Sequence, residues 1–230
     1  MERVAPILMI CNEENYIMLV IRNLLKVFPK VYVADTGSTD ETLAQILLSG
    51  EYARARIKLW TYSGLSLAEL GQIRFEIGKQ ARQLFGAEWA FQVDGDELYH
   101  VDALRYIVDN PMPEGKLMGF TKMVSVDRDA DGNYWELSDV FSRAAIFPIT
   151  DTWTGDYPFE TPLSFFLGKE HFHYFDLPFG YKVHGYHLHP LDRSSKDNEV
   201  PLRLEKQKQF SMQPQKHSRV TMIGDKLPGE

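Results

Sequence analysis

The chain has 230 residues, 44% of them hydrophobic, and a formal net charge of -7. This length and apolar content fit one globular domain with a sizeable core, and the acidic balance argues against a protein that binds nucleic acid. The single cysteine, Cys11, excludes an internal disulfide framework and a cysteine-based zinc site, and it fits a reducing cytoplasm. The first residues lack the pattern of a signal peptide, and no apolar run reaches the length of a transmembrane segment. We therefore expect a cytoplasmic protein, and peripheral contact with a membrane stays open.

Short apolar runs alternate with helical patterns through the first hundred residues. The runs predict strands at 7–10, 31–34, 57–60 and 89–93. Helical spacing predicts helices between them, which are one that Asn12 caps and Pro29 ends, one over about 41–49 opened by Ser38, Thr39 and Asp40, and one over 67–85. This order predicts an α/β fold with a mainly parallel, twisted sheet that is flanked by helices on both faces.

The pattern changes after residue 100. We expect a helix over 101–108, then two strands, 117–126 and 134–147, that form a hairpin. Residues 150–190 are rich in aromatic side chains and predict long loops with short strands, and 199–209 could form an amphipathic helix. No linker is evident, so we expect a single domain over 1–210 and a polar, loosely ordered tail over 211–230.

Carboxylates follow the strand at 89–93 directly. Asp94, Asp96 and Glu97 surround Gly95, which permits a sharp turn and removes a side chain between the two aspartates. Both aspartates could then bind one Mg²⁺ or Mn²⁺ that substrate phosphates also hold. A solvated Asp-Gly turn explains the same residues when they are taken alone.

Asp35 favours the ligand-binding interpretation of these carboxylates over the solvated turn, because it ends the second predicted strand. Acids at the carboxyl ends of two strands in one parallel sheet can face the same ligand. The helix start that follows accounts for Ser38 to Asp40 but not for Asp35. The chain contains neither the glycine fingerprint of a dinucleotide site nor a Walker loop.

Three sequence blocks together resemble family 2 glycosyltransferases of the GT-A fold. The blocks are 7–15 with its Asn-Glu-Glu, 33–42 with Asp-Thr-Gly-Ser-Thr-Asp-Glu-Thr, and 91–97 with Asp-Gly-Asp, and a fourth, 71–74, resembles the helix that carries an arginine. Where the family usually has an asparagine after that arginine, this chain has Phe75. The resemblance covers the first 98 residues well and 117–189 loosely.

The resemblance implies a role for each matched position. Cys11, Asn12 and Glu13 would line a nucleotide pocket, which Arg74 would face. Asp35 would accept a hydrogen bond from the base, most often uracil, so a UDP-sugar is the favoured donor substrate. Asp94 would contact the ribose or the metal, and Asp96 would bind the Mn²⁺ or Mg²⁺ on the diphosphate. Residues 1–100 would then be the nucleotide-binding half and 101–210 the acceptor half.

Five histidines cluster late in the chain, at 171, 173, 184, 187 and 189. A zinc site is one interpretation, but packing among aromatic loops is preferred for His171 and His173. A strand over 182–189 would put His187 and His189 on one face. Enzymes that this chain resembles bring a late histidine to the metal, so His187 is favoured as a ligand and His189 follows it.

An acidic loop at 127–133 has the spacing of the first half of a calcium loop. A calcium loop needs a carboxylate at its twelfth position, where this chain has Ser138. The Asp-Gly pair of a hairpin turn is the preferred interpretation.

The general base is predicted from resemblance in the stretch 153–163. An acid follows the hairpin in similar enzymes, and Glu160 takes its place here, with Asp156 as the rival. Both acids could equally be solvated loop residues.

These observations predict an inverting, metal-dependent glycosyltransferase that moves a sugar from a nucleoside-diphosphate sugar to a saccharide, lipid or protein acceptor. Two alternatives stay open, which are a nucleotidyltransferase and a catalytically silent nucleotide-sugar binding module of the same fold. A nucleotidyltransferase would need a glycine-rich loop with a basic residue where Asn12, Glu13 and Glu14 stand.

Overall fold

A computed structural model of the chain describes residues 3–110, 112–116, 118–149, 153–154, 161–162, 172–176, 180, 182–188, 219–224 and 226. Within these ranges the helices are α1 Ile17–Leu24, α2 Thr42–Leu48, α3 Gly50–Ala53, α4 Leu67–Phe85 and α5 Val101–Asp109. The strands are β1 Val4–Ile10, β2 Val31–Asp35, β3 Ile57–Thr61, β4 Trp89–Asp94, β5 Glu97–Tyr99, β6 Met118–Arg128, β7 Tyr134–Pro148, β8 Trp153–Thr154, β9 Thr161–Pro162, β10 Phe172–Tyr174, β11 Gly185–His187 and β12 Arg219–Gly224.

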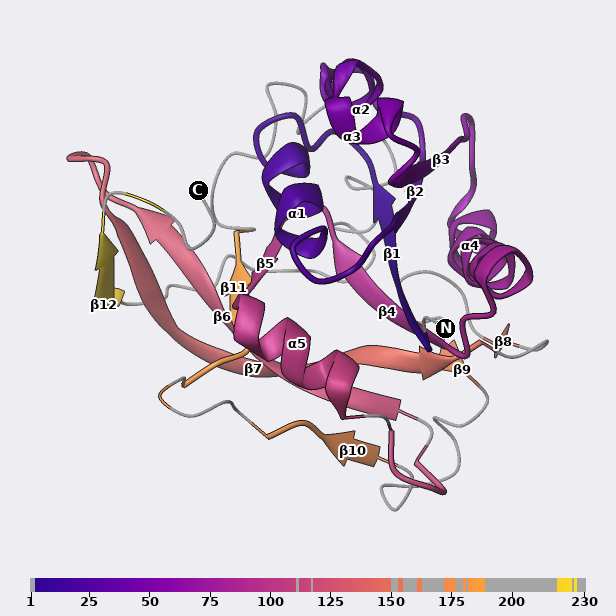
Figure 1. Cartoon of the computed structure of the whole chain (residues 1–230). Helices are drawn as coiled ribbons and strands as arrows, with labels where there is room; N and C mark the ends of the chain where they lie inside the picture. The colour runs from indigo at the N-terminus through magenta and orange to yellow at the C-terminus, as the bar shows by residue number, and fades with distance from the viewer. Residues whose placement is uncertain are drawn as a thin grey trace.

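Strands β3, β2, β1 and β4 lie side by side in that order and run parallel, and helices connect them (Figure 1). The predicted α/β fold with a mainly parallel, twisted sheet is therefore confirmed. The chain leaves β1 towards β2 on one side and returns later to β4 on the other. β1, β2 and β4 end at Ile10, Asp35 and Asp94. We call this end of the three strands the carboxyl edge, and it is where open α/β sheets bind ligands.

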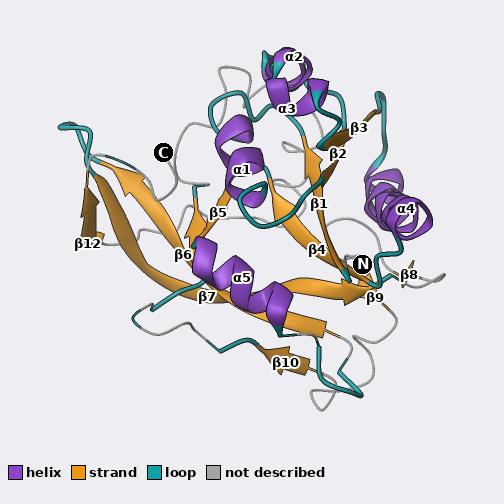
Figure 2. Cartoon of the chain, in the orientation of Figure 1, coloured by secondary structure: helices purple, strands orange, loops and turns teal. Residues whose placement is uncertain are grey.

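Strands β7, β6, β11, β5, β10 and β12 extend the sheet on the far side of β4, whereas β8 and β9 form a separate two-stranded sheet (Figure 2). β7 runs antiparallel to β4, and β6 and β7 form the predicted hairpin. β11 then lies between β6 and β5, parallel to the first and antiparallel to the second. Two of these strands differ from expectation. β5 was not predicted, and β12 pairs with β7 inside the segment expected to be a loose tail.

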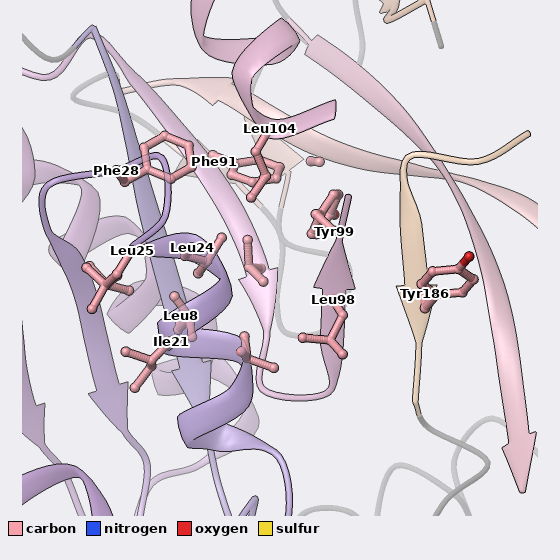
Figure 3. Close-up of a cluster of buried hydrophobic side chains, with 14 of the residues drawn as sticks. Leu8, Ile21, Leu24, Leu25, Phe28, Phe91, Leu98, Tyr99, Leu104 and Tyr186 are labelled. Carbon is pink, nitrogen blue, oxygen red and sulfur yellow. The ribbon is translucent and has the colours of Figure 1, made fainter. Parts of the chain in front are cut away.

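Alternating side chains of the central strands divide the core between two faces of the sheet. Leu8 and Phe91 point to the face that α1 and α5 cover, as Figure 3 shows, and Ile7 and Ala90 point to the face that α4 covers. These four residues are at most 1% exposed. Each large apolar side chain buried in this way stabilises the fold by about 1.5–3 kcal/mol. Among the described residues, no helix combines the length and apolarity that a membrane-spanning segment requires.

Helix ends follow local sequence signals in α4 but not in α2. Ser66 and Glu69 form a reciprocal capping box at the start of α4, and Gly86 ends that helix with φ 72°. The helix predicted over 41–49 is shorter. It ends at Leu48, because Ser49 takes an extended conformation and its hydroxyl accepts the Tyr52 N–H at the start of α3. The amphipathic helix proposed for 199–209 lies outside the described residues.

Candidate active site

Strand register brings the two predicted strand-end acids to either side of β1. Asp35 pairs with Ile10, and Asp94 pairs with Met9. Neighbouring strands lie about 4.8 Å apart, so the two acids are separated by about 10 Å across the end of β1. An extended ligand lying across the carboxyl edge can therefore contact both.

Hydrogen bonds tie the loop after β1 to the loop after β2. The Asn12 N–H donates to Ser38 Oγ at 2.9 Å, and the Thr39 N–H donates to Asn12 Oδ1 at 2.8 Å. The Glu13 N–H donates to Thr42 Oγ1 at 2.7 Å. The motif residues of these two blocks therefore hold the loops in one fixed arrangement.

Two predicted helix caps are wrong as a result. Asn12 does not cap α1, which starts at Ile17 after Tyr16, and Asn12 instead has a left-handed φ of 55°. Ser38 likewise faces the loop after β1 rather than α2. Asp40 does bond to the first turn of α2, because its Oδ1 accepts the Thr42 N–H at 2.9 Å. Much of the sequence motif thus has a structural role.

The Asp35 carboxylate is buried, and among the described residues only one of its two oxygens has hydrogen-bond partners. Its Oδ1 accepts the backbone N–H groups of Gly37 at 3.1 Å and Ser38 at 3.0 Å. Its Oδ2 is buried and has no hydrogen-bond partner within the part of the chain that the structure describes. A buried carboxylate oxygen left in this state is costly, and an N–H donor on a bound ligand would satisfy it.

The turn between β4 and β5 is closed by Glu97 and packed by Glu13. Glu97 is fully buried, and its Oε2 accepts the Asp94 N–H at 3.1 Å. The chain does turn at Gly95, as expected, but Gly95 does not adopt a positive φ, so the turn does not require the conformational freedom of glycine. A Cβ at Gly95 would instead lie 2.6 Å from Glu13 Cγ. The position needs glycine because the Glu13 side chain lies against it.

Two arginines face Asp94. Arg143 of β7 places Nη1 3.1 Å from Asp94 Oδ2, and Arg74 of α4 places Nη2 3.8 Å from Asp94 Oδ1. Burial raises the pKa of Asp94, but the guanidinium groups of Arg143 and Arg74 outweigh burial and hold that pKa well below its ordinary value. Asp94 is therefore a carboxylate at neutral pH, and both of its oxygens lie close to arginines.

Arg143 also forms an ion pair with Glu97 through the same Nη1. Its side chain is 13% exposed. In the amide orientation that satisfies both groups, Gln92 accepts a hydrogen bond from Arg74 Nη1 at 2.9 Å. The acidic turn is thus contacted by one arginine from β7 and one from α4.

Asp96 meets His187. The two side chains approach to 3.8 Å between Asp96 Oδ2 and His187 Nε2, and Asp96 is 1% exposed. This approach comes from strand pairing, because His187 of β11 lies opposite Glu97 of β5. The Phe141 ring stands edge-on to the imidazole, with centroids 5.7 Å apart. Leu188 fixes the end of β11 by donating its N–H to the Asp96 carbonyl at 2.7 Å.

The antiparallel pair of β5 and β11 depends on close backbone contact and on a side chain of α1. A Cβ at Gly185 would collide with the Leu98 carbonyl oxygen. On the other edge of β5, Asn23 Nδ2 donates to the Tyr99 carbonyl at 2.9 Å, and the Tyr99 N–H donates to Asn23 Oδ1 at 3.1 Å. β5 is therefore fixed along both edges.

The donor set of Asp96 and His187 fits a partly protein-bound divalent cation. Within the described ranges, no group of three His, Cys, Asp or Glu side chains is arranged to hold a metal. Mg²⁺ and Mn²⁺ at nucleotide sites are commonly held by one or two protein groups and by substrate phosphates. A carboxylate and an imidazole 3.8 Å apart meet that requirement. His189, the second predicted histidine ligand, lies outside the described residues.

Other histidines have structural surroundings. His173 packs edge-on against Phe175 with ring centroids 4.6 Å apart, as the packing interpretation predicts. His184 is 1% exposed, and its Nδ1 accepts the Lys122 N–H at 2.9 Å while its Nε2 lies 3.2 Å from the Asp176 carbonyl. Burial lowers the pKa of His184, so this imidazole is neutral with its proton on Nε2. His171 lies outside the described residues.

The acidic loop at 127–133 is a hairpin turn, as preferred over the calcium interpretation. Asp129 Oδ1 accepts the N–H groups of Asp131 at 3.0 Å and Asn133 at 2.8 Å, and its Oδ2 accepts the Trp135 indole N–H at 2.7 Å. The Trp135 hydrogen bond is the main cause that lowers the pKa of Asp129 to about 2. The carboxylate is therefore committed to the turn.

The predicted general base remains a prediction. Strands β8 and β9 pair Trp153 with Pro162 and Thr154 with Thr161. Glu160 and Asp156 lie between these strands in sequence and fall outside the described residues. Cys11, by contrast, lies half-buried where β1 ends, next to Asn12.

Arg143 and Glu97 are the residues of this edge to which sequence reasoning gave no role. Glu97 continues the acidic motif and could have been recognised as its buried member. Arg143 stands directly before the apolar run Ala144 to Phe147, inside the predicted strand, and a cation next to such a run is a signal that a carboxylate lies nearby.

No protein-family model and no curated protein matches the chain, whereas solved structures do. TarS of S. aureus is 25% identical over 56% of this chain and 23% of its own, with a TM-score of 0.40. Glucosyl-3-phosphoglycerate synthase of Mycobacterium tuberculosis, in complex with Mn²⁺, UDP and phosphoglyceric acid, is 18% identical over 53% of this chain and 43% of its own, with a TM-score of 0.37. A 4-diphosphocytidyl-2C-methyl-D-erythritol synthase is 8% identical over 65% of this chain and 76% of its own, with a TM-score of 0.43.

These structures include glycosyltransferases of the GT-A fold, the class that the sequence motifs resemble. The matched part spans about a quarter of TarS and less than half of the mycobacterial synthase. With TM-scores of 0.43 and below, the likeness assigns no role to a residue. The function is therefore argued from the side chains at the carboxyl edge.

Proposed function

We propose that the chain is a glycosyltransferase that takes a sugar from a nucleoside-diphosphate sugar, with a UDP-sugar as the favoured donor. The observation that carries the proposal is the buried Asp35 Oδ2, which has no hydrogen-bond partner among the described residues. Asp35 lies two strands away from Asp94. Asp94 in turn lies next to the turn that carries Asp96. A nucleotide base would donate an N–H to Asp35 at one end of the carboxyl edge, and the diphosphate would lie near Asp96 at the other end.

Asp96 and His187 would hold the divalent cation. Mn²⁺ suits this pair, since it accepts carboxylate oxygen and also imidazole nitrogen, and Mg²⁺ is the alternative. When bound, the cation would neutralise the charge that develops on the leaving nucleoside diphosphate. Of the two roles predicted for Asp94, contact with the ribose is favoured, because its oxygens already lie close to Arg143 and Arg74.

Inversion at the sugar needs a base on the acceptor side, within hydrogen-bond reach of the acceptor hydroxyl. Asp96 would be committed to the cation, so the base must come from elsewhere in the chain. Glu160 is proposed for this role, with Asp156 as the rival, and the acceptor is a saccharide, lipid or protein.

Nucleotide and metal binding can be tested together by thermal unfolding. The protein is heated with UDP, GDP, CDP or dTDP, each with and without Mn²⁺, and a ligand of the folded state raises the melting temperature. UDP with Mn²⁺ is expected to give the largest shift, and Asp96→Asn should remove the Mn²⁺-dependent part while the protein stays folded. Asp102→Asn, an exposed acid on α5, is the matched control. Equal shifts in EDTA and in Mn²⁺ would contradict the metal role.

Turnover separates the enzyme from its alternatives. Glu160→Gln is expected to keep UDP binding and to lower the rate of sugar transfer or UDP-sugar hydrolysis by about a hundredfold or more, as for a lost general base. Normal turnover in Glu160→Gln with an inactive Asp156→Asn would move the role to Asp156. Binding without turnover in the wild type indicates a silent module, and pyrophosphate release from a nucleoside triphosphate indicates a nucleotidyltransferase.

A further inference from the structure

Two neighbouring leucines in the last turn of α2 are exposed to solvent. Leu48 is 87% exposed, more than any other large apolar residue in the described part of the chain, and Leu47 is 45% exposed. Tyr52 of α3 follows four residues after Leu48 and is 39% exposed. A single exposed leucine is ordinary on a protein surface, but these three side chains together form an apolar patch, which we call the α2–α3 patch.

The local fold explains why the leucines point outwards. Thr42 and Ile46 lie one turn apart on α2 and are buried, so this stripe of the helix faces the core. Leu47 and Leu48 follow on the remaining surface of the helix. α2 ends there because Ser49 is extended and caps α3. Leu48 therefore stands at the corner between two helices, where no neighbouring element covers it.

Basic side chains are concentrated in the segments that carry the patch. Residues 17–30 and 42–58, which hold α1, α2 and α3, contain six basic side chains and one acidic side chain, whereas the whole chain has a net charge of -7. Arg56 joins the two segments, because its Nη2 donates to the Leu25 carbonyl at 2.7 Å. The exposed basic residues of these segments are Arg22, Lys26 and Arg54.

The acid of these segments, Glu51, is paired within α3 and its surroundings. Glu51 lies 3.1 Å from Arg56 and 3.8 Å from Arg54, and its side chain is 21% exposed. Arg56 is the closer partner, while the Arg54 side chain is 71% exposed. The Arg54 guanidinium is therefore accessible to an anion outside the protein. Asp40 and Glu41 precede the first turn of α2, at the opposite end of that helix from the patch.

We propose that the α2–α3 patch docks on a membrane that contains anionic lipids. Its apolar side chains enter the interfacial layer, and Arg54 contacts the headgroups. Leucine gains free energy when it leaves water for this layer, tyrosine favours the interface, and basic side chains are attracted to anionic headgroups. Salt screens exposed charges beyond about 8–10 Å, so the groups nearest to the membrane outweigh the acidic balance of the whole chain.

A membrane fits this patch better than a protein partner does. Stable protein interfaces bury about 800 Å² on each partner around a well-packed centre, whereas the patch consists of three apolar residues at the corner of two short helices. A second copy of the chain would also bring two basic surfaces together.

The position of the patch has a consequence for the acceptor. α2 and α3 lie at the end of the sheet to which β1 points (Figure 1), so a membrane at the patch lies beside the carboxyl edge. This position favours a lipid among the three acceptor classes. Only this step rests on the proposed function, because docking itself requires neither nucleotide nor sugar transfer.

Sedimentation with lipid vesicles tests the docking in the absence of nucleotide and divalent cation. The wild type should bind vesicles of phosphatidylcholine and phosphatidylserine more tightly than vesicles of phosphatidylcholine alone, and added salt should weaken this binding. Leu47→Gln/Leu48→Gln keeps good helix formers in α2 and should weaken binding by about tenfold or more, since no leucine enters the membrane. Leu84→Gln, which changes a leucine that is 53% exposed on α4, is the matched control and should bind like the wild type.

The electrostatic part is tested by Arg54→Gln. This variant should bind the anionic vesicles about fivefold more weakly, the effect of one basic side chain near such a surface, and should bind phosphatidylcholine vesicles like the wild type. Arg105→Gln is the matched control, because both arginines are exposed and each pairs with an acid three residues earlier, Glu51 and Asp102 respectively. It should bind both kinds of vesicle like the wild type.

Three results would overturn the inference. A wild type that does not sediment with anionic vesicles excludes docking, and equal losses in the α2 and α4 leucine variants exclude this patch as the docking surface. Concentration-dependent dimers in analytical ultracentrifugation, abolished by Leu47→Gln/Leu48→Gln, would assign the patch to a second copy of the chain. None of these results touches the nucleotide and metal sites, and a protein without transferase activity could still dock as described.

Discussion

At the scale of single residues, Asp35 shows a conflict between stability and binding. Its carboxylate is 2% exposed, and one oxygen has no partner among the described residues. Asn at this position would keep an oxygen for the Gly37 and Ser38 N–H groups and would remove the buried charge. A residue that costs stability in the absence of ligand is typical of a binding site.

Asp35→Asn is therefore expected to raise the free energy of unfolding of the ligand-free protein, because a neutral amide costs less to bury than a charge. The same change should weaken nucleotide binding by about 1–3 kcal/mol, the cost of an unmet polar partner. Urea denaturation measures the first effect and calorimetry the second. A variant that is less stable and binds nucleotide normally would show that Asp35 has a structural role only.

At the scale of elements, β11 is the strand that carries a distant histidine to the acidic turn. Its three residues, Gly185 to His187, pair with β5 on one side and β6 on the other. Gly185 has to lack a side chain, because a Cβ would meet the Leu98 carbonyl oxygen. The approach of His187 to Asp96 thus depends on a residue with no functional group.

Gly185→Ala should lower the free energy of unfolding by about 1–3 kcal/mol, the usual cost of overpacking, and should weaken Mn²⁺ binding by moving His187. Gly78→Ala offers a matched control in α4, where the added Cβ would lie at an ordinary 3.8 Å from Ile149. That helix substitution should raise the free energy of unfolding by about 0.5–1 kcal/mol and leave Mn²⁺ binding unchanged. Equal effects of the two substitutions would show that β11 and β5 can separate freely.

At the scale of the whole molecule, one buried and two half-buried histidines make stability depend on pH. Burial lowers the pKa of His184, His100 and His173 below the ordinary value of 6.5. Between each lowered pKa and 6.5 the unfolded chain binds more protons than the folded chain, so stability rises with pH in this window. The contribution is complete above pH 6.5 and is lost as the pH falls through the folded-state values.

The free energy of unfolding from urea denaturation should therefore decrease from pH 7.5 to 5.5. His184→Gln has one buried imidazole fewer, so its decrease over the same range should be smaller. Asp94 and Asp129, with lowered pKa values, lose their contributions only below 3.8 and do not affect this window. A free energy of unfolding that is constant or rises as the pH falls would contradict the neutral state of these histidines.

The first half of the fold could be predicted because its signals are local. Each strand from β1 to β4 is a short apolar run followed by polar residues, and α4 begins and ends at the capping residues that its sequence shows. The strand-end acids Asp35 and Asp94 follow from the same pattern. Asn12 was assigned the wrong local role because its partner Thr39 lies in another loop, which no local pattern reveals.

The second half of the site depends on pairing between distant segments. A strand around His187 was expected, but His187 reaches Asp96 only because β11 inserts between β6 and β5, and no pattern within that segment shows which strands it joins. Arg143 reaches Asp94 through the register of β4 and β7, which is set by side-chain packing along both strands. Alternation within one strand predicts which residues share a face, but not which residue lies opposite in the neighbouring strand.

The carboxamide of Asn23 has a consequence for how the molecule meets other chains. Among the residues that the structure describes, β5 is the last strand on its side of the sheet, and such a strand normally presents unpaired backbone groups that another strand can join. Asn23 satisfies both the N–H and the C=O of Tyr99, as a residue of a neighbouring strand would. A single side chain of α1 therefore keeps the backbone groups of Tyr99 from pairing edge to edge with another chain, in the strand that begins with the buried Glu97.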